Sequence, residues 1–217
     1  GLTPTKLGGG QQTQSVRFVA PDSSEWVFRS VHKGSRVLSK QFDHTIVAYI
    51  FHDYGSASHP VGNIPAAVLL DKAMLLHPTP HLAIMPDDPA LGKFRKEFAG
   101  MLGTIEEYPA APKQGKAFAD AKDISDSDKP REKSNKDPGE QIDARAFLTA
   151  RLMDFFLGDN DRHPGQWKWA RFGKKDDSPW EPIGRERDKV FVSYGGTIGS
   201  IARIGLPVLI SFKPTYP

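Results

Sequence analysis

The chain has 217 residues and a net charge of +3, from 29 basic and 26 acidic side chains spread along its length. The length allows one large domain or two small lobes, and the balanced charge, without a concentrated basic stripe, argues against nucleic acid as a partner. The absence of cysteine excludes disulfides and thiolate metal sites, and the apolar runs are too short to predict a transmembrane segment.

The N-terminal part predicts a strand hairpin with a glycine-rich entry. Residues 15–20 and 25–31 carry strand patterns and are joined by a Pro-Asp-Ser-Ser turn. The cluster Gly8, Gly9 and Gly10 precedes them. Backbone amides in such a cluster can approach phosphate oxygens closely, because no side chain intervenes. A flexible N-terminal tail would explain the same glycines.

The middle of the chain predicts helices and a short strand. Helical spacing of apolar residues occurs at 44–54, 64–76 and 91–107. A short apolar run at 81–85 predicts a strand. Residues 108–139 interleave acidic and basic side chains with few apolar ones, which predicts a solvated insertion, a mobile loop or a linker.

The chain's best helical pattern covers residues 141–157 and ends at Gly158. Seven apolar side chains are spaced as on one buried helix face: Ile142, Ala146, Phe147, Ala150, Met153, Phe156 and Leu157. Beyond this helix, residues 167–172 and 180–183 predict two strands joined by a turn.

A polar loop follows this helix directly. The segment 158–169, GDNDRHPGQWKW, puts two carboxylates, a guanidinium, an imidazole and an amide within nine residues. A buried helix can hold such a loop still for catalysis, because the rigid element fixes its position. The same residues also fit a solvated helix-to-strand turn, in which Arg162 pairs with Asp159 for little net gain.

The order Asp161, Arg162, His163, then Gln166 resembles the catalytic loop of atypical kinases. These are the phosphatidylinositol kinases, the HipA-type toxin kinases and the secretory-pathway kinases, many of which carry Asp-Arg-His followed two residues later by Asn. The resemblance implies that Asp161 orients or deprotonates the acceptor hydroxyl and that Arg162 and His163 support it. Gln166 stands where a magnesium-binding Asn is usual.

The longer block with Trp167 and Trp169 also resembles a domain of bacterial envelope proteins of unassigned activity. That resemblance implies an envelope or periplasmic location, whereas the composition by itself leaves the compartment unknown.

The kinase resemblance also implies roles for residues elsewhere. Kinases of this fold place a basic residue on a strand to grip the nucleotide phosphates, and Arg29 matches that position. No Glu occurs between Glu25 and Glu97, so Asp53 on the expected helix replaces the usual partner of that cation. Arg29 is equally compatible with the surface of an edge strand.

Two further features are implied in the same way. Related kinases carry a second Asp that chelates magnesium soon after the catalytic loop, and Asp188 fits by order and spacing, with Glu186 as the alternative. Both residues also fit a charged hairpin tip. The turn at 86–89 would be the hinge between two lobes, with adenine bound to its backbone.

We therefore expect an α+β protein with a two-lobed, protein-kinase-like fold. A small β-rich N-lobe would cover 1–107, a charged insertion or linker 108–139, and a helical, truncated C-lobe 140–217. The expected function is an ATP- and magnesium-dependent phosphotransferase that modifies a hydroxyl group on an unidentified protein or small molecule.

Two other functions fit the sequence. The first is a catalytically inactive kinase-like binding or scaffolding module, favoured by the missing helix Glu, the Gln in place of Asn and the Arg in place of Lys. The second is a metal-dependent hydrolase built on Asp159, Asp161 and His163.

Overall fold

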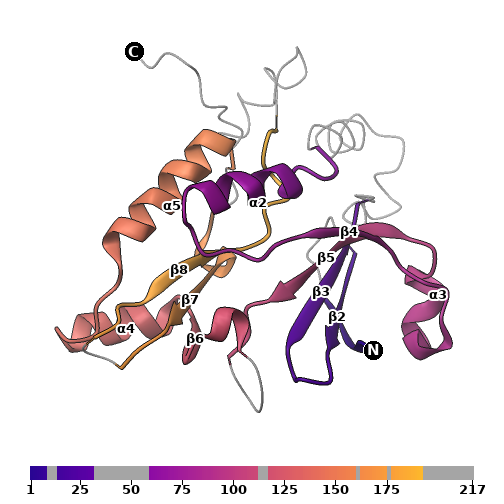
Figure 1. Cartoon of the computed structure of the whole chain (residues 1–217), viewed down its shortest axis with the longest axis horizontal. Coiled ribbons are helices and arrows are strands. Elements are labelled where there is room, and N and C mark those ends of the chain that lie inside the picture. Colours follow the sequence, from indigo (N-terminus) through magenta and orange to yellow (C-terminus); the bar gives the residue numbers. More distant parts are fainter. Residues whose placement is uncertain (9–13, 32–58, 112–116, 160–161, 175–176, 193–217) are drawn as a thin grey trace, which may run out of the picture.

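The computed structural model describes residues 1–8, 14–31, 59–111, 117–159, 162–174 and 177–192. Five strands form one antiparallel sheet in the order β1-β2-β3-β5-β4 (Figure 1). These strands are β1 (Thr3–Gly8), β2 (Ser15–Val19), β3 (Glu25–Ser30), β4 (His81–Ile84) and β5 (Leu102–Tyr108).

Three strands form a second antiparallel sheet in the order β6-β7-β8. They are β6 (Asp123–Asp126), β7 (Trp167–Arg171) and β8 (Glu181–Gly184). The α-helices are α2 (Asn63–Lys72), α3 (Arg95–Phe98), α4 (Asp128–Lys136) and α5 (Ala144–Leu157). Short 3₁₀ turns occur at η1 (Pro89–Phe94), η2 (Phe118–Asp120) and η3 (Pro164–Gln166).

The five-stranded sheet buries one apolar face against the segment that contains η1 and α3. Val16 and Phe18 of β2 and Phe28 of β3 pack in one cluster with Phe94 and Phe98. The rings of Phe28 and Phe98 meet edge to face with centroids 6.3 Å apart, a favourable aromatic geometry. This packing fixes β3, the strand that carries Arg29.

Helix α5 begins and ends at residues suited to those positions. The Asp143 carboxylate accepts a hydrogen bond from the Ala146 amide at 2.8 Å, which caps the first turn. Gly158 adopts φ = 68° at the other end, a left-handed conformation that glycine tolerates. The chain is thus turned sharply into the polar loop.

Helix α2 lies above the strands and beside α5 in Figure 1, and it packs against α5 through Ala66 and Leu70. Its Leu70 lies in one apolar cluster with Ala150 of α5 and Trp167 of β7. At its N-terminal end, Asn63 Nδ2 donates to Thr104 Oγ1 of β5 at 3.2 Å. The helix therefore links the five-stranded sheet to the second half of the chain.

Several elements expected from the sequence are confirmed. The strands predicted at 15–20, 25–31, 81–85, 167–172 and 180–183 correspond to β2, β3, β4, β7 and β8, and the helices predicted at 64–76 and 141–157 correspond to α2 and α5. The helix expected at 44–54 lies outside the described residues.

The helix predicted at 91–107 is wrong for most of its length. The structure has the short η1 and α3 there and then β5, which is the neighbour of β3. Thr104, Glu106 and Tyr108 are buried at every second position, as in a strand. The β-branched pair Thr104-Ile105 after Gly103 favours that strand over a helix.

Of the alternatives for 108–139, a solvated insertion, a mobile loop or a linker, the mobile loop is wrong for residues 123–136. Here β6 pairs with β7 and α4 follows it, with Ile124 and Pro130 buried. The charged residues lie in exposed ion pairs such as Lys129 with Asp123 and Arg131 with Asp128. The high density of charged residues in this segment therefore reflects a solvent-exposed helix face and not a lack of secondary structure.

Two smaller expectations also fail. Phe156, predicted on the buried face of α5, is 72% exposed, while Asp154 is buried there. The turn at 86–89, predicted as the hinge, connects β4 to η1 within the first half of the chain and not to the second sheet. Within the described residues, none of the helices has both the length and the apolar composition needed to cross a membrane.

Candidate functional site

The guanidinium of Arg29 joins two distant parts of the chain. It projects from β3, with its side chain 14% exposed. One nitrogen, Nη1, makes a short ion pair with Glu106 of β5. The other, Nη2, donates to Glu186 Oε1 at 3.2 Å, across 157 residues of sequence. Arg29 is thus the electrostatic link between the five-stranded sheet and the turn after β8.

The turn that supplies Glu186 is held in an unusual backbone conformation. It spans residues 184–188 and begins where β8 ends at Gly184. A Cβ on Gly184 would lie 2.7 Å from Arg187 Nη2, so any other residue at this position would have to displace the end of the Arg187 side chain. Glu186 itself has φ = 53°, a left-handed conformation that costs free energy for a non-glycine residue. Arg29 and Arg185 hold the Glu186 side chain in place, because both donate to its Oε1 atom.

Gln166 connects this turn to the polar loop. Its backbone carbonyl accepts from the Arg185 amide at 3.0 Å, and its side chain helps to lower the pKa of Glu186. Gln166 is buried, and its Oε1 atom has no hydrogen-bond partner within the described part of the chain. A buried hydrogen-bond acceptor without a partner costs folding free energy, unless a ligand supplies the missing interaction.

The charges at Arg29 reinforce each other. Burial alone would lower the pKa of Arg29, but Glu106, Glu186 and Asp188 outweigh burial and raise it. Burial alone would raise the pKa of Glu186, but Arg29 and Arg185 outweigh burial and lower it. Arg185 Nη2 donates to Glu186 Oε1 at 2.6 Å. Both Glu186 and Arg29 are therefore held in their charged forms.

A buried ion cluster lies behind the turn. Asp154 of α5 pairs with Arg187 Nη1 at 2.6 Å and with Arg162 Nε at 3.4 Å. Asp159 makes a short ion pair with Arg162 and lies 3.3 Å from Arg187. Burial is the main cause of the raised pKa of Asp154, even against both guanidiniums. The cluster ties α5, the polar loop and the turn together.

Arg162 also bonds to the turn backbone. Its Nη1 donates to the Arg185 carbonyl at 2.6 Å, and its side chain is 1% exposed. Buried charges of this kind require partners on every side. Arg162 therefore fixes the position of the turn that carries Glu186 and Asp188.

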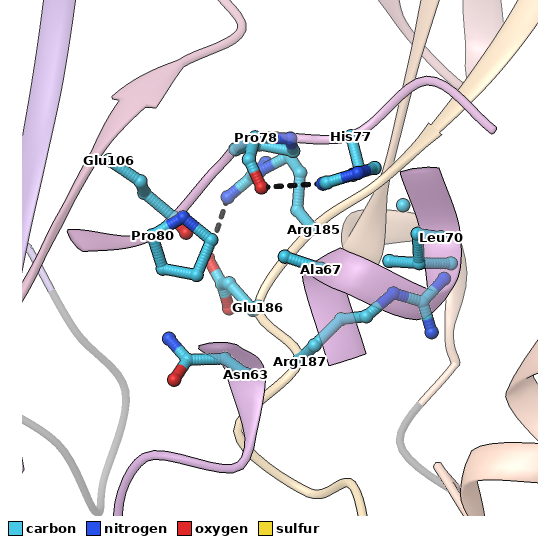
Figure 2. Close-up of a pocket in the computed structure, with 11 residues that line it drawn as sticks. Asn63, Ala67, Leu70, His77, Pro78, Pro80, Glu106, Arg185, Glu186 and Arg187 are labelled. Carbon is cyan, nitrogen blue, oxygen red and sulfur yellow. Dashed lines mark hydrogen bonds and ion pairs between the residues drawn. The ribbon is translucent and has the colours of Figure 1, made fainter. Parts of the chain in front are cut away.

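A small pocket opens beside these residues (Figure 2). Ala67 and Leu70 of α2 form its apolar side, and Glu106, Arg185 and Glu186 supply charged groups. It contains about 250 Å³ of space, part of it open to solvent. The enclosed cavity itself is about 10 Å³, room for about one water molecule and far below the volume of about 300–1,000 Å³ usual for pockets that enclose a small molecule.

The residues present fit a magnesium ion in one respect. Carboxylate and amide oxygens are the ligands that Mg²⁺ prefers, and Glu186 lies beside the unpartnered Gln166 Oε1. Within the part of the chain that the structure describes, no group of three or more His, Asp or Glu residues is arranged to hold a metal ion. Glu106 and Glu186 instead converge on the Arg29 guanidinium.

The structure brings several of the predicted site residues together. Arg29, Gln166 and Asp188 lie around Glu186, as the contacts above and the effect of Asp188 on the Arg29 pKa indicate. His163 is exposed, and its Nδ1 accepts from the Gly165 amide at 3.1 Å, which caps η3. Gly8 ends β1. The other predicted site residues, Gly9, Gly10, Asp53 and Asp161, lie outside the described residues.

Two residues of the site were missed from the sequence. Glu106 fell inside a segment predicted as helix, and Arg185 had no assigned role. The alternation of Thr104, Glu106 and Tyr108 would have placed Glu106 on one face of a strand, which is the signal that could have identified it.

The described residues thus define a mixed α+β protein, with an internal ion-pair site between a five-stranded sheet and a turn of the second half. No protein-family model matches the chain, and no curated protein matches it either.

Proposed function

We propose that the protein is an ATP- and magnesium-dependent phosphotransferase with a two-lobed, kinase-like fold. The observation that supports this most is the ion pair between Arg29 of β3 and Glu186, with Asp188 close enough to raise the Arg29 pKa. A phosphate-gripping cation and metal-binding carboxylates, which are far apart in sequence, therefore meet in one place. Phosphoryl transfer depends mainly on such positioning and charge neutralisation.

The order of elements adds support. In protein kinases a glycine-rich loop covers the phosphates and the phosphate-binding basic residue lies on the third strand. In this chain the glycine cluster falls between β1 and β2, and Arg29 is on β3. Kinases also pair this cation with a Glu of a helix, whereas Arg29 pairs with Glu106 of a strand. The cation is Arg in place of the usual Lys, so it can grip phosphate with two parallel hydrogen bonds.

The proposed roles follow from this arrangement. Arg29 and the backbone amides near Gly8 bind phosphate oxygens, while Asp188 and Gln166 provide oxygen ligands for magnesium, which neutralises phosphate charge when bound. Asp161 keeps the role that the resemblance implies. The acceptor oxygen bonds to the γ-phosphorus, the bond from phosphorus to the β–γ bridging oxygen breaks, and Asp161 accepts the hydroxyl proton.

A catalytically inactive binding or scaffolding module is the second candidate. It is favoured by the small volume of the pocket and by Arg29 already being neutralised by Glu106 and Glu186. For the hydrolase alternative, Asp159 is buried and its Oδ2 atom is engaged by Arg162 and Arg187. Only its Oδ1 atom, which has no hydrogen-bond partner among the described residues, is left to bind a metal.

Binding and turnover, measured separately, test the proposal. Mg-ATP should release heat on titration and raise the melting temperature of the wild-type protein, and labelled γ-phosphate should appear on the protein or as free phosphate. Asp161→Asn should keep the binding and lose the transfer. Binding without transfer in the wild type would assign the inactive module. No heat and no thermal stabilisation at millimolar Mg-ATP would overturn the proposal.

A further inference from the structure

The carboxylates of the site already have a counter-ion. Glu106, Glu186 and Asp188 face the guanidiniums of Arg29 and Arg185, so the charges nearly balance without any metal. The side chains of Arg29, Glu106 and Arg185 are 14%, 10% and 8% exposed. Interactions among charges in such a weakly solvated place are stronger than at a surface.

A divalent cation that approached Glu186 alone would meet strong repulsion. Its Oε1 oxygen already accepts from Arg29 at 3.2 Å and from Arg185 at 2.6 Å. Two positive charges would then lie beside the incoming dication. Because like charges repel each other, the two guanidiniums weaken the binding of a dication at either oxygen of the carboxylate while they remain on it.

A polyphosphate anion would remove that block. Guanidiniums bind phosphate oxygens in two parallel, charge-assisted hydrogen bonds, and both arginines could exchange Glu186 for phosphate. Glu186 would then be released beside Gln166, whose buried Oε1 has no partner. The amide oxygen and the released carboxylate would together offer a cation two oxygen ligands.

We propose that Arg29 acts as an internal counter-ion that excludes divalent metal from Glu186 and Asp188 until a polyphosphate draws the guanidinium away. Metal and polyphosphate therefore bind cooperatively, and the metal alone does not bind. This inference rests on the proposed function, because it concerns the same site, and it adds Glu186 to the metal-binding residues as well as an order of binding.

The test compares Mn²⁺ alone, inorganic tripolyphosphate alone, and both together, by calorimetry and thermal shift on the full chain. For the wild type we expect no binding of Mn²⁺ alone and binding of the two together. Arg29→Met removes the counter-ion and should gain binding of Mn²⁺ alone, by more than about tenfold in Kd.

Arg171→Met is the matched control. Arg171 lies on β7 with its side chain 13% exposed and pairs with Glu140 at 3.0 Å, so its burial and its type of partner match those of Arg29. It should gain no metal binding. If Arg29→Met does not fold, Glu186→Gln replaces it, and Mn²⁺ should then enhance the binding of tripolyphosphate less in that variant than in the wild type; an equal enhancement would overturn the role of Glu186.

The outcomes separate this inference from the proposed function. Tight binding of Mn²⁺ alone to the wild type, or a folded Arg29→Met variant that gains none, overturns the counter-ion role even if Mg-ATP binds. Cooperative binding of Mn²⁺ and tripolyphosphate supports the counter-ion role of Arg29 even if Mg-ATP does not bind. In that case only the proposed use of ATP is contradicted.

Discussion

Arg29 and Glu186 form an ion pair at 3.2 Å although 157 residues separate them in the sequence. The same guanidinium pairs with Glu106 through its other terminal nitrogen. The planar guanidinium of Arg29 thus pairs with two carboxylates from two elements, a geometry that the single ammonium of a lysine cannot reproduce.

Arg29→Lys should therefore destabilise the protein although the charge is retained. One of the two carboxylates would lose its direct partner in a largely buried place, at a cost of about 1–3 kcal/mol. Urea unfolding followed by tryptophan fluorescence measures this loss. Lys129→Arg, at an exposed pair with Asp123, is the control and should change stability by less than about 0.5 kcal/mol. Equal effects of the two substitutions would contradict the bridging role.

Asp154→Asn, which removes one negative charge with almost no change in side-chain shape, should strongly destabilise the protein. Its side chain is 2% exposed and faces Arg187, Arg162 and Arg151. Neutralising it leaves buried guanidiniums short of negative charge, which costs about 3–5 kcal/mol. The comparison is Asp128→Asn, whose pair with Arg131 is exposed and is worth at most about 1 kcal/mol. Chemical unfolding of both variants gives the two values, and a loss below about 1 kcal/mol for Asp154→Asn would refute the argument.

The elements that sequence could predict are those whose local pattern agrees with their surroundings. Helix α5 has an acidic cap, apolar periodicity and a terminal glycine, and β2 and β3 alternate around a short turn. In β5 the local pattern conflicts with the tertiary structure. Phe94 and Phe98 continue the helical spacing into Leu102 and Ile105, but β5 pairs with both β3 and β4, and strand pairing outweighs a weak local preference.

The sequence suggested residues of the candidate site only where the chain resembles the kinase catalytic loop. Gln166 and Arg162 stand inside the motif, and Arg29 and Asp188 followed from their order relative to it. Glu106 and Arg185 became visible only with the sheet order, because β5 lies next to β3 in space while 72 residues separate Ser30 from Leu102 in sequence. A partner chosen by strand pairing has no signature in local spacing.

Stability at low pH should depend on Glu186. Burial alone would raise its pKa, but Arg29 and Arg185 outweigh burial, so the folded-state pKa is lowered. The stabilisation from a carboxylate with a lowered pKa is present above the unfolded-state value of about 4.3 and is lost as the pH falls through the folded-state pKa. The difference in unfolding free energy between wild type and Glu186→Gln should therefore shrink as the pH is lowered from 6 toward about 3. Denaturant unfolding at several pH values measures this difference. If the difference widens as the pH falls, the folded-state pKa of Glu186 is not lowered.

Gly103→Ala should disturb both the core and the site. Gly103 of β5 lies opposite Ser30 and Ala83 in the sheet, and a Cβ there would collide with the Phe28 ring and the Arg29 carbonyl oxygen. Relief requires a shift of the strand that carries the Arg29 guanidinium, so we expect a loss of about 1–3 kcal/mol in stability and weaker binding of tripolyphosphate with Mn²⁺. Gly8→Ala is the control for stability, because its new Cβ would meet the small Ser15 hydroxyl at 2.8 Å, which can rotate away. If Gly103→Ala proves no more destabilising than Gly8→Ala, the close contact between β3 and β5 does not fix Arg29 as argued.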